Sequence, residues 1–282
     1  MKTTATYDVM YVGQLRFVEC VDIHRPLLQN AKNIYGVFVE DLIDSWNVNL
    51  GASYSCVGDM TFKDAVEYFI KATGTADITV IDSAKYNQFI DTAGVTYFNS
   101  QRFLMMADLI KNTDSDFVIV LSTDLIMQPS FILDNEFFDY FDKLESEVFV
   151  KTNLNPTLLR THLIIFNSKG VAQLKNTWQD SYRRFISEDR VRQKRVETTW
   201  EALLIYSGIK IKDMQYLIQE TPFRPTMRFD EVKKLNFNYI GKKDNEWREY
   251  KSNALKKVGY RPSTFLSIPF NQTQGTYESD KQ

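Results

Sequence analysis

An apolar segment near the middle of the sequence is followed directly by a short polar run that could do chemistry. Residues 117–121 (FVIVL) are the strongest apolar run, and Ser122, Thr123 and Asp124 come immediately after it. A carboxylate at the end of a buried strand could bind Mg²⁺ or Mn²⁺, because these hard cations take oxygen ligands. Such a cation could neutralise charge on a departing diphosphate. Taken alone, Asp124 could equally be an ordinary loop or helix-capping residue.

The first apolar segment of the chain also runs into polar residues. Residues 8–12 (DVMYV) are predicted to form a strand, and Gly13, Gln14 and Arg16 follow it. A glycine lets the backbone approach a phosphate closely, and an arginine offers a fork of donors to a diphosphate. The ordinary alternative is a turn glycine beside a solvated arginine.

A third set of polar residues follows a strand predicted over 77–82. Asp82 and Ser83 stand at its end, and a carboxylate there could accept hydrogen bonds from a ribose or a base. Arg102, on a helix that we expect to begin near residue 99, could reach a diphosphate. Asp82 and Ser83 could instead cap the next helix, which is the commoner use of these residue types.

Two glutamates share one face of a later helix. The helix predicted over 196–206 carries Glu197 and Glu201, which are four residues apart and therefore point the same way. Either carboxylate could act as a general base toward an acceptor hydroxyl. The alternative is a pair of acids that interact favourably with the amino-terminal end of the helix dipole.

The elements that would position these residues alternate between strands and helices. This alternation predicts an α/β fold with a mainly parallel sheet flanked by helices. Open sheets of this kind bind ligands at the carboxyl ends of their strands, so the polar residues should gather at one edge. Strands are expected over 8–12, 35–39, 77–82, 95–98, 117–121, 161–166 and 209–211, and helices over about 23–33, 61–74, 99–111, 129–147, 168–185 and 196–206.

Charge divides the chain into two unlike halves. The formal net charge is -2, but residues 1–150 carry 10 Lys/Arg and 22 Asp/Glu, whereas residues 151–282 carry 24 and 14. A basic half suggests a polyanionic partner, with basic groups on phosphates and aromatic rings, Tyr182 among them, stacking on an exposed base. Alternatively, the two halves complement each other across an internal interface, or the basic clusters are solvated helix faces. The residues expected to contact nucleic acid are Arg183, Arg184, Arg192, Lys194, Arg195, Lys242, Lys243 and Trp247.

Composition excludes several classes of protein. With 44% hydrophobic and 25% charged residues, the chain is neither disordered nor fibrous. No apolar run reaches the roughly 18 residues of a membrane span, and residues 1–4 open no signal peptide. Two cysteines and two histidines argue against a disulfide framework and against a Cys/His zinc site. We therefore expect a cytoplasmic protein with no membrane partner.

Taken in chain order, these features resemble the GT-A type of nucleotide-sugar glycosyltransferase over residues 7–215. The segment 117–124 resembles the strand and Asp-x-Asp metal motif of that family. Ser122 stands where the first acid of the motif is expected and Asp124 where the second is. The serine departs from the family pattern and weakens the expectation of strong metal dependence.

The other strand ends fit the same resemblance. Gly13, Gln14 and Arg16 match a Gly-Gln-x-Arg pattern that ends the first strand in a subset of these enzymes. Asp82 stands where the family has a nucleoside-contacting Asp, and Glu197 stands about where its catalytic acidic pair precedes a glycine. Only one member of that pair is acidic here, so the choice between the two glutamates stays open.

The resemblance implies a GT-A-like (Rossmann-like) sheet, a nucleotide-diphosphate sugar donor such as a UDP-sugar, and a divalent cation, Mn²⁺ or Mg²⁺, on Asp124. It implies Glu197 or Glu201 as the catalytic residue. The residues that it assigns to the donor are Gly13, Gln14, Arg16, Asp82, Ser83, Arg102 and Asp124.

The basic second half narrows the resemblance to the small DNA-modifying sugar transferases of T-even-type bacteriophages. These act on 5-hydroxymethylcytosine in viral DNA, or on a sugar already attached to it, which implies DNA as the acceptor and the host cytoplasm as the location. Two alternatives remain: a glycosyltransferase acting on a polysaccharide, lipopolysaccharide or protein glycan, and a non-catalytic nucleic-acid-binding protein on a transferase scaffold. We expect a catalytic domain over 1–220, with a donor-binding part at about 7–128 and an acceptor part at about 129–220, and a basic aromatic-rich extension over 221–282.

Overall fold

The computed structural model of the chain describes residues 5–40, 53–81, 97–127, 147–152, 159–187, 196–213, 220–222 and 228–230. Their strands form a seven-stranded sheet in the order β3-β2-β1-β4-β7-β6-β8 and a separate pair, β5-β9. The strands are β1 (Tyr7–Gln14), β2 (Asn33–Val39), β3 (Ile78–Ile81), β4 (Phe117–Leu121), β5 (Leu125–Met127), β6 (Glu147–Thr152), β7 (Leu159–Phe166), β8 (Lys210–Asp213) and β9 (Glu220–Pro222). The helices are the 3-10 helix η1 (Val18–His24), α1 (Arg25–Leu28), α3 (Phe62–Thr73), α5 (Tyr97–Asn112), α7 (Ser168–Ser187) and α8 (Val196–Tyr206).

The large sheet is mainly parallel, as the sequence predicted. Strands β3, β2, β1 and β4 run parallel to one another, and β6 runs parallel to β8. Strand β7 is antiparallel to both of its neighbours, β4 and β6. The predicted α/β fold class, a mainly parallel sheet with helices on its faces, is therefore confirmed, with one reversed strand in the middle of the sheet.

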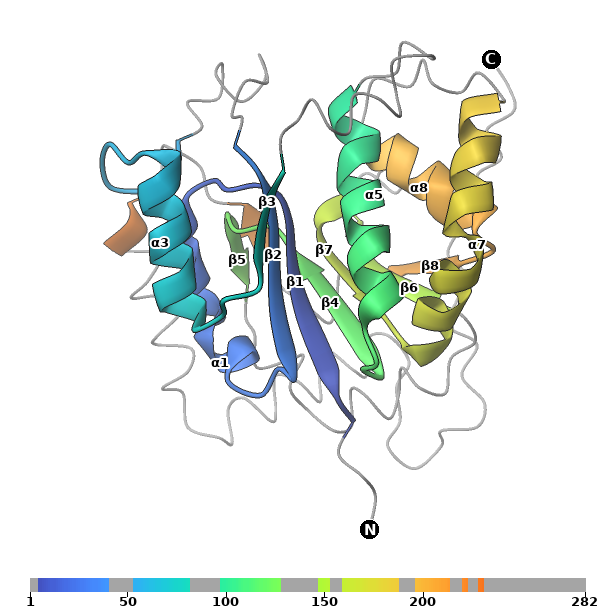
Figure 1. The fold of residues 1–282 in the computed structure, drawn as a ribbon, viewed down its shortest axis with the longest axis horizontal. Helices are drawn as coiled ribbons and strands as arrows, with labels where there is room; N and C mark the ends of the chain where they lie inside the picture. Colours follow the sequence, from blue (N-terminus) through green and yellow to red (C-terminus); the bar gives the residue numbers. More distant parts are fainter. Residues whose placement is uncertain are drawn as a thin grey trace.

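Helices cover both faces of this sheet, and each face has its own core. Figure 1 shows α1 and α3 on one side and α5, α7 and α8 on the other. All five residues of β4 are buried and alternate between the cores: Phe117, Ile119 and Leu121 face the first, and Val118 and Val120 face the second. A continuous apolar run is what a strand covered on both faces requires, which explains the sequence of this segment.

Helix boundaries follow local sequence signals. Thr61 caps α3 and forms a capping box with Asp64, in which the Thr61 side chain accepts a hydrogen bond from the Asp64 backbone and the Asp64 side chain accepts one from the Thr61 backbone. The helix ends at Gly74, whose φ of 73° lies in the left-handed region that favours glycine. Gly208, with φ 71°, follows α8 in the same way. Both helix ends agree with the boundaries predicted from the sequence.

Three sequence predictions about elements were wrong. Tyr97 and Phe98 belong to helix α5 rather than to a strand over 95–98, because a short β-branched and aromatic run fits either structure until its packing is known. Glu147 begins strand β6, which was not predicted; the rest of the helix expected over 129–147 lies outside the described residues. The helix expected over 23–33 is instead the short η1 and α1, followed by β2 from Asn33.

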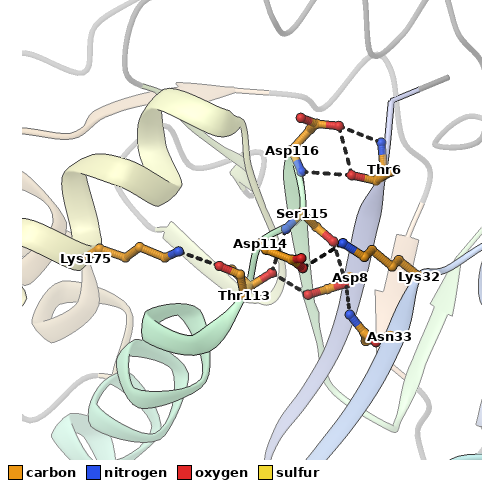
Figure 2. Close-up of polar contacts among 9 residues, drawn as sticks. All are labelled: Thr6, Asp8, Lys32, Asn33, Thr113, Asp114, Ser115, Asp116 and Lys175. Atoms are coloured by element: carbon orange, nitrogen blue, oxygen red, sulfur yellow. Dashed lines mark hydrogen bonds and ion pairs between the residues drawn. The ribbon is translucent and has the colours of Figure 1, made fainter. Parts of the chain in front are cut away.

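A buried carboxylate ties the sheet together at the amino end of β1. Asp8 is fully buried and accepts hydrogen bonds from the hydroxyls of Thr113 and Ser115, the latter at 2.7 Å, and from the Asn33 amide at 3.0 Å. These partners come from the loop between α5 and β4 and from the start of β2 (Figure 2). The Lys32 ammonium pairs with the exposed Asp114 carboxylate 2.7 Å away. This polar cluster lies at the amino end of β1, whereas the candidate residues Gly13, Gln14 and Arg16 lie at its carboxyl end.

No helix in the described part of the chain is long and apolar enough to cross a membrane.

Candidate functional site

The carboxyl ends of β1 and β4 lie side by side and are joined through one threonine. The parallel register pairs Tyr11 with Leu121, so the segments after both strands leave the sheet together. The Thr123 hydroxyl accepts a hydrogen bond from the Arg16 backbone N–H at 3.0 Å and donates one to the Arg16 carbonyl at 2.7 Å. Because Thr123 is 1% exposed, these bonds are shielded from water and fix the two segments relative to each other.

An ion pair joins the two charged residues predicted at these ends. The Arg16 guanidinium Nη2 lies 2.9 Å from Asp124 Oδ2, and their side chains are 17% and 5% exposed. A charge-assisted hydrogen bond of this length in a largely buried setting is stronger than a surface ion pair. The pair places one donor fork and one carboxylate at the edge where α/β sheets of this kind bind ligands.

Backbone conformation next to the pair depends on a glycine. Gly13 has φ 116°, in the region that side chains disfavour, and Gln14 is half-buried at the end of β1. Phe17 is the one non-glycine residue with positive φ in the described chain, at 46°, and its side chain is buried. The chain after β1 therefore follows a specific backbone conformation, and Gly13 supplies a positive φ that other residues adopt only with strain.

His162 belongs to the same group, although the sequence analysis gave it no role. The antiparallel pairing of β4 with β7 places Leu163 opposite Leu121, which brings His162 beside Ser122. The Ser122 hydroxyl lies 3.0 Å from His162 Nδ1, and that nitrogen lies 4.0 Å from Asp124 Oδ1. The position of His162 follows from the reversal of β7, which no local sequence signal disclosed.

A buried histidine, His24, hydrogen-bonds to the backbone of the residue that follows Asp124. His24 Nε2 lies 2.6 Å from the Leu125 carbonyl, and His24 Nδ1 lies 2.9 Å from the Tyr11 hydroxyl. Burial lowers the pKa of His24 to about 4, against the opposing effects of the Leu125 carbonyl and of Asp124. The ring is therefore neutral at pH 7. Since a carbonyl only accepts, Nε2 carries the proton and donates to Leu125, and Nδ1 accepts from Tyr11.

A second buried carboxylate fastens the turn after β1 to the segment 53–57. The Glu19 carboxylate accepts hydrogen bonds from the Ser55 hydroxyl and from the Cys56 backbone N–H, the latter at 2.8 Å. The backbone N–H of Phe17 donates to the Ser53 carbonyl at 3.0 Å. Cys20 and Cys56 are both free thiols, with their sulfur atoms 3.6 Å apart.

The structure brings together four of the predicted donor residues: Gly13, Gln14, Arg16 and Asp124. Asp82 and Ser83 lie outside the described residues, although β3, which precedes them, is in place. Arg102 and Glu197 lie on α5 and α8, but their side chains are not among those described. Glu201 is half-buried on α8. The roles of all seven donor candidates and of the two catalytic candidates stay predictions. The same holds for Arg192, Lys194, Arg195, Lys242, Lys243 and Trp247, which also lie outside the described residues.

Two of the predicted nucleic-acid contacts lie exposed on α7 and have local partners. Arg183 pairs with Asp180 one helical turn earlier at 3.2 Å, and the Arg184 guanidinium stacks over the Tyr206 ring, 4.5 Å from its centre. Tyr182, by contrast, is 8% exposed and packs in the second core, so the expectation that its ring stacks on a base is wrong. Its helical spacing from Phe185 marks it as a core residue.

Asp124 and Ser122 offer the oxygen atoms that a hard cation prefers. The described residues contain no group of three His, Cys, Asp or Glu that could hold a metal by themselves. Asp124 supplies a buried carboxylate, and Ser122 supplies a hydroxyl two residues before it. Mg²⁺ commonly binds through one or two carboxylates and completes its shell with substrate phosphates and water. The residues therefore fit a cation that arrives with a phosphorylated ligand, once Asp124 is released from Arg16.

No protein-family model and no curated protein matches this sequence. Among solved structures, the chain is similar to the galactosyltransferase LgtC, with 10% identity and a TM-score of 0.42, over 87% of this chain and 100% of that one. It is similar to the glycosyltransferase GlyE of Streptococcus pneumoniae TIGR4, with 11% identity and a TM-score of 0.39, over 76% and 46%. It is also similar to glucosyl-3-phosphoglycerate synthase of Mycobacterium tuberculosis, in a complex with Mg²⁺ and UDP, with 10% identity and a TM-score of 0.32, over 78% and 88%. These are similarities of the backbone fold. Any assignment of function to this protein depends on its own residues.

Proposed function

We propose that the protein is a glycosyltransferase that moves a sugar from a nucleotide-diphosphate sugar, such as a UDP-sugar, to a hydroxyl group. The observation that carries this proposal is the Arg16–Asp124 ion pair at the adjoining carboxyl ends of β1 and β4. This edge of an α/β sheet is where nucleotides bind in such folds. A guanidinium fork there suits a diphosphate, and a buried carboxylate suits the cation that accompanies one.

The chain's own groups account for donor binding and departure. Arg16 would hold the diphosphate by charge-assisted hydrogen bonds that strengthen as negative charge builds on the leaving group. Gly13 lets the backbone approach the donor, and Thr123 keeps the Arg16 backbone in place through two hydrogen bonds. Asp82, Ser83 and Arg102 would complete the contacts to the nucleotide.

A divalent cation, Mn²⁺ or Mg²⁺, would be held by Asp124 with the Ser122 hydroxyl nearby, and would add charge neutralisation at the diphosphate. The acceptor hydroxyl would lose its proton to Glu197 or Glu201 if the reaction inverts the sugar configuration. In a reaction that retains the configuration, the two glutamates would only orient groups.

The proposed acceptor is DNA that contains 5-hydroxymethylcytosine, or a sugar already attached to that base, in the cytoplasm of a phage-infected host. Support comes from the excess of 24 Lys/Arg over 14 Asp/Glu in residues 151–282. Exposed Arg183 and Arg184 lie on this half of the chain. Extrusion of the modified base from the duplex would present its hydroxyl to the site, and the basic residues would hold the phosphates.

The test is release of nucleotide diphosphate from a panel of nucleotide sugars in Mn²⁺, with and without DNA containing 5-hydroxymethylcytosine. Release that depends on this DNA supports both donor and acceptor. Slow release that does not depend on DNA supports the transferase and rejects the acceptor, in favour of a glycan. No release from any donor, together with salt-dependent DNA binding, rejects the enzyme in favour of a nucleic-acid-binding protein.

A further inference from the structure

The ion pair that supports the proposed function also poses a problem for it. Arg16 is assigned to the donor diphosphate and Asp124 to the cation, yet here the two side chains bind each other, with Nη2 and Oδ2 2.9 Å apart. Each group must leave the other before it can take its assigned ligand. We infer that Arg16 is a resident counter-ion of Asp124, and that diphosphate and divalent cation displace this ion pair together rather than one at a time. This inference rests on the proposed function and adds a binding order to it.

Either ligand alone would leave one charge poorly compensated. A cation that binds Asp124 alone must displace the Arg16 guanidinium while that positive charge stays close by, since its backbone is fixed beside Thr123. A diphosphate that draws Arg16 away leaves Asp124, 5% exposed, without this counter-ion and facing an anion. Burying a charge without its partner is costly, and like charges at short range repel. Neither ligand alone satisfies both groups.

Both ligands together restore the balance. The diphosphate takes the place of Asp124 at the guanidinium, and the cation takes the place of Arg16 at the carboxylate, so Arg16 and Asp124 each keep an opposite charge beside them. Each ligand therefore raises the affinity for the other beyond the direct contact between cation and phosphate. Thermodynamic linkage makes this coupling equal in both directions.

The exchange requires movement of a side chain only. The Arg16 N–H and carbonyl are both bonded to Thr123, and the Leu125 carbonyl is bonded to His24, so the backbone on both sides of the pair is held. The guanidinium is joined to that backbone by a flexible stem and can swing from the carboxylate to a diphosphate. These two backbone segments are already held in place before any ligand arrives.

The experiment measures Mn²⁺ and UDP binding to the full chain, separately and together. Loss of the free Mn²⁺ signal in electron paramagnetic resonance reports the cation, and isothermal titration calorimetry reports UDP. The variants are Arg16→Gln, which removes the counter-ion, and Arg16→Lys, which keeps the charge without the fork. Arg25→Gln, at an exposed arginine on α1, is the matched control.

The expected result is that Arg16→Gln binds Mn²⁺ alone about tenfold more tightly than the wild type, and UDP alone more weakly. The factor by which UDP tightens Mn²⁺ binding should fall by about fivefold or more in Arg16→Gln. Arg16→Lys should bind Mn²⁺ alone as weakly as the wild type, and Arg25→Gln should match the wild type throughout. Circular dichroism verifies that each variant is folded.

Failure of the inference and failure of the proposed function give different results. If the wild type binds UDP with Mn²⁺ but Arg16→Gln has the same Mn²⁺ affinity and the same coupling factor, the proposed function stands and the inference is overturned. If Arg16→Gln does not fold and Arg16→Lys binds Mn²⁺ alone about tenfold more tightly than the wild type, the counter-ion role is also overturned. If the wild type binds no nucleotide diphosphate, the donor site is rejected, and the Mn²⁺ affinities alone still decide whether Arg16 competes with a cation for Asp124.

Discussion

The Ser122 hydroxyl lies 3.0 Å from Nδ1 of His162, across the antiparallel boundary between β4 and β7. His162 Nδ1 is in turn 4.0 Å from Asp124 Oδ1. Where the Asp-x-Asp motif has its first carboxylate, this chain has the neutral Ser122 hydroxyl. The His162 imidazole lies next to that hydroxyl. The site holds one carboxylate, with the cationic Arg16 guanidinium at one oxygen and the His162 imidazole near the other, which makes it a weaker cation site than a pair of acids.

Replacing Ser122 with aspartate should strengthen cation binding. The new carboxylate would lie beside Asp124 and within reach of His162, so two acidic oxygen donors could hold one cation. We expect Ser122→Asp to bind Mn²⁺ about tenfold more tightly than Ser122→Asn, the neutral variant of the same shape. Mn²⁺ titration followed by electron paramagnetic resonance measures the difference. Equal affinities for the two variants would show that Ser122 does not adjoin the cation position.

Thr123→Val should weaken the connection between the segments that follow β1 and β4. The substitution keeps the shape of a side chain that is 1% exposed but leaves the Arg16 N–H and carbonyl without their bonds to the hydroxyl. We expect a loss of about 1–3 kcal/mol in the free energy of unfolding, measured in urea, and weaker UDP binding. Thr123→Ser keeps the hydroxyl and is the control. A Val variant as stable as the Ser variant would contradict the role of these bonds.

Acidification should destabilise the protein through His24. The unfolded imidazole takes up a proton below its ordinary pKa of about 6.5, whereas the buried one does so only near a pKa of about 4. Between these values the unfolded state binds more protons than the native state, so the free energy of unfolding falls as the pH falls. For this group alone, the loss between pH 7 and pH 5 is about 2 kcal/mol.

Urea unfolding of the wild type and of His24→Gln at both pH values measures this contribution. The variant should start less stable at pH 7, because the bonds to Leu125 and Tyr11 are disturbed. It should then lose about 2 kcal/mol less than the wild type on going to pH 5, since glutamine does not titrate. Parallel profiles for the two proteins would mean that His24 is not held neutral in the native state.

How far the sequence predicts this fold depends on how local each signal is. The apolar run 117–121 and the capping box at Thr61 are local, and both led to correct elements. The start of α5 at Tyr97 was missed because the aromatic and β-branched residues there favour a strand when read without their packing.

The candidate site shows the same difference between what local sequence predicts and what it does not. Arg16 and Asp124 were each predicted at a strand end, but as separate ligands of a donor and a cation. Their ion pair depends on β1 and β4 being neighbours, across 108 positions of the chain, which no local pattern states. His162 was missed for a related reason, since its contact with Ser122 requires β7 to run against β4. Contacts that depend on strand order or direction need the tertiary structure.

Asp8→Ala should destabilise the sheet without affecting the donor site directly. The carboxylate is fully buried and accepts three side-chain hydrogen bonds at the amino end of β1, so truncation leaves Thr113, Ser115 and Asn33 without this acceptor. We expect a loss of about 2–4 kcal/mol in the free energy of unfolding. Asp116→Ala, which removes exposed bonds to Thr6 in the same cluster, should cost below about 1 kcal/mol. Similar losses for both would contradict the importance of the hydrogen bonds to the buried Asp8 carboxylate, which Figure 2 draws.

Glu197 and Glu201 can be separated by a matched pair of substitutions, because they lie one turn apart on α8. If the transfer inverts the sugar configuration, the residue that takes the acceptor proton should lose about 10² to 10⁴ in kcat when changed to glutamine, with little change in UDP binding. The other variant should stay within about tenfold of the wild type, since it removes a charge near the helix end but no proton acceptor. Product configuration determined by nuclear magnetic resonance tells which case applies. Inversion together with two nearly active variants would exclude both glutamates as the base and move the search to residues outside α8.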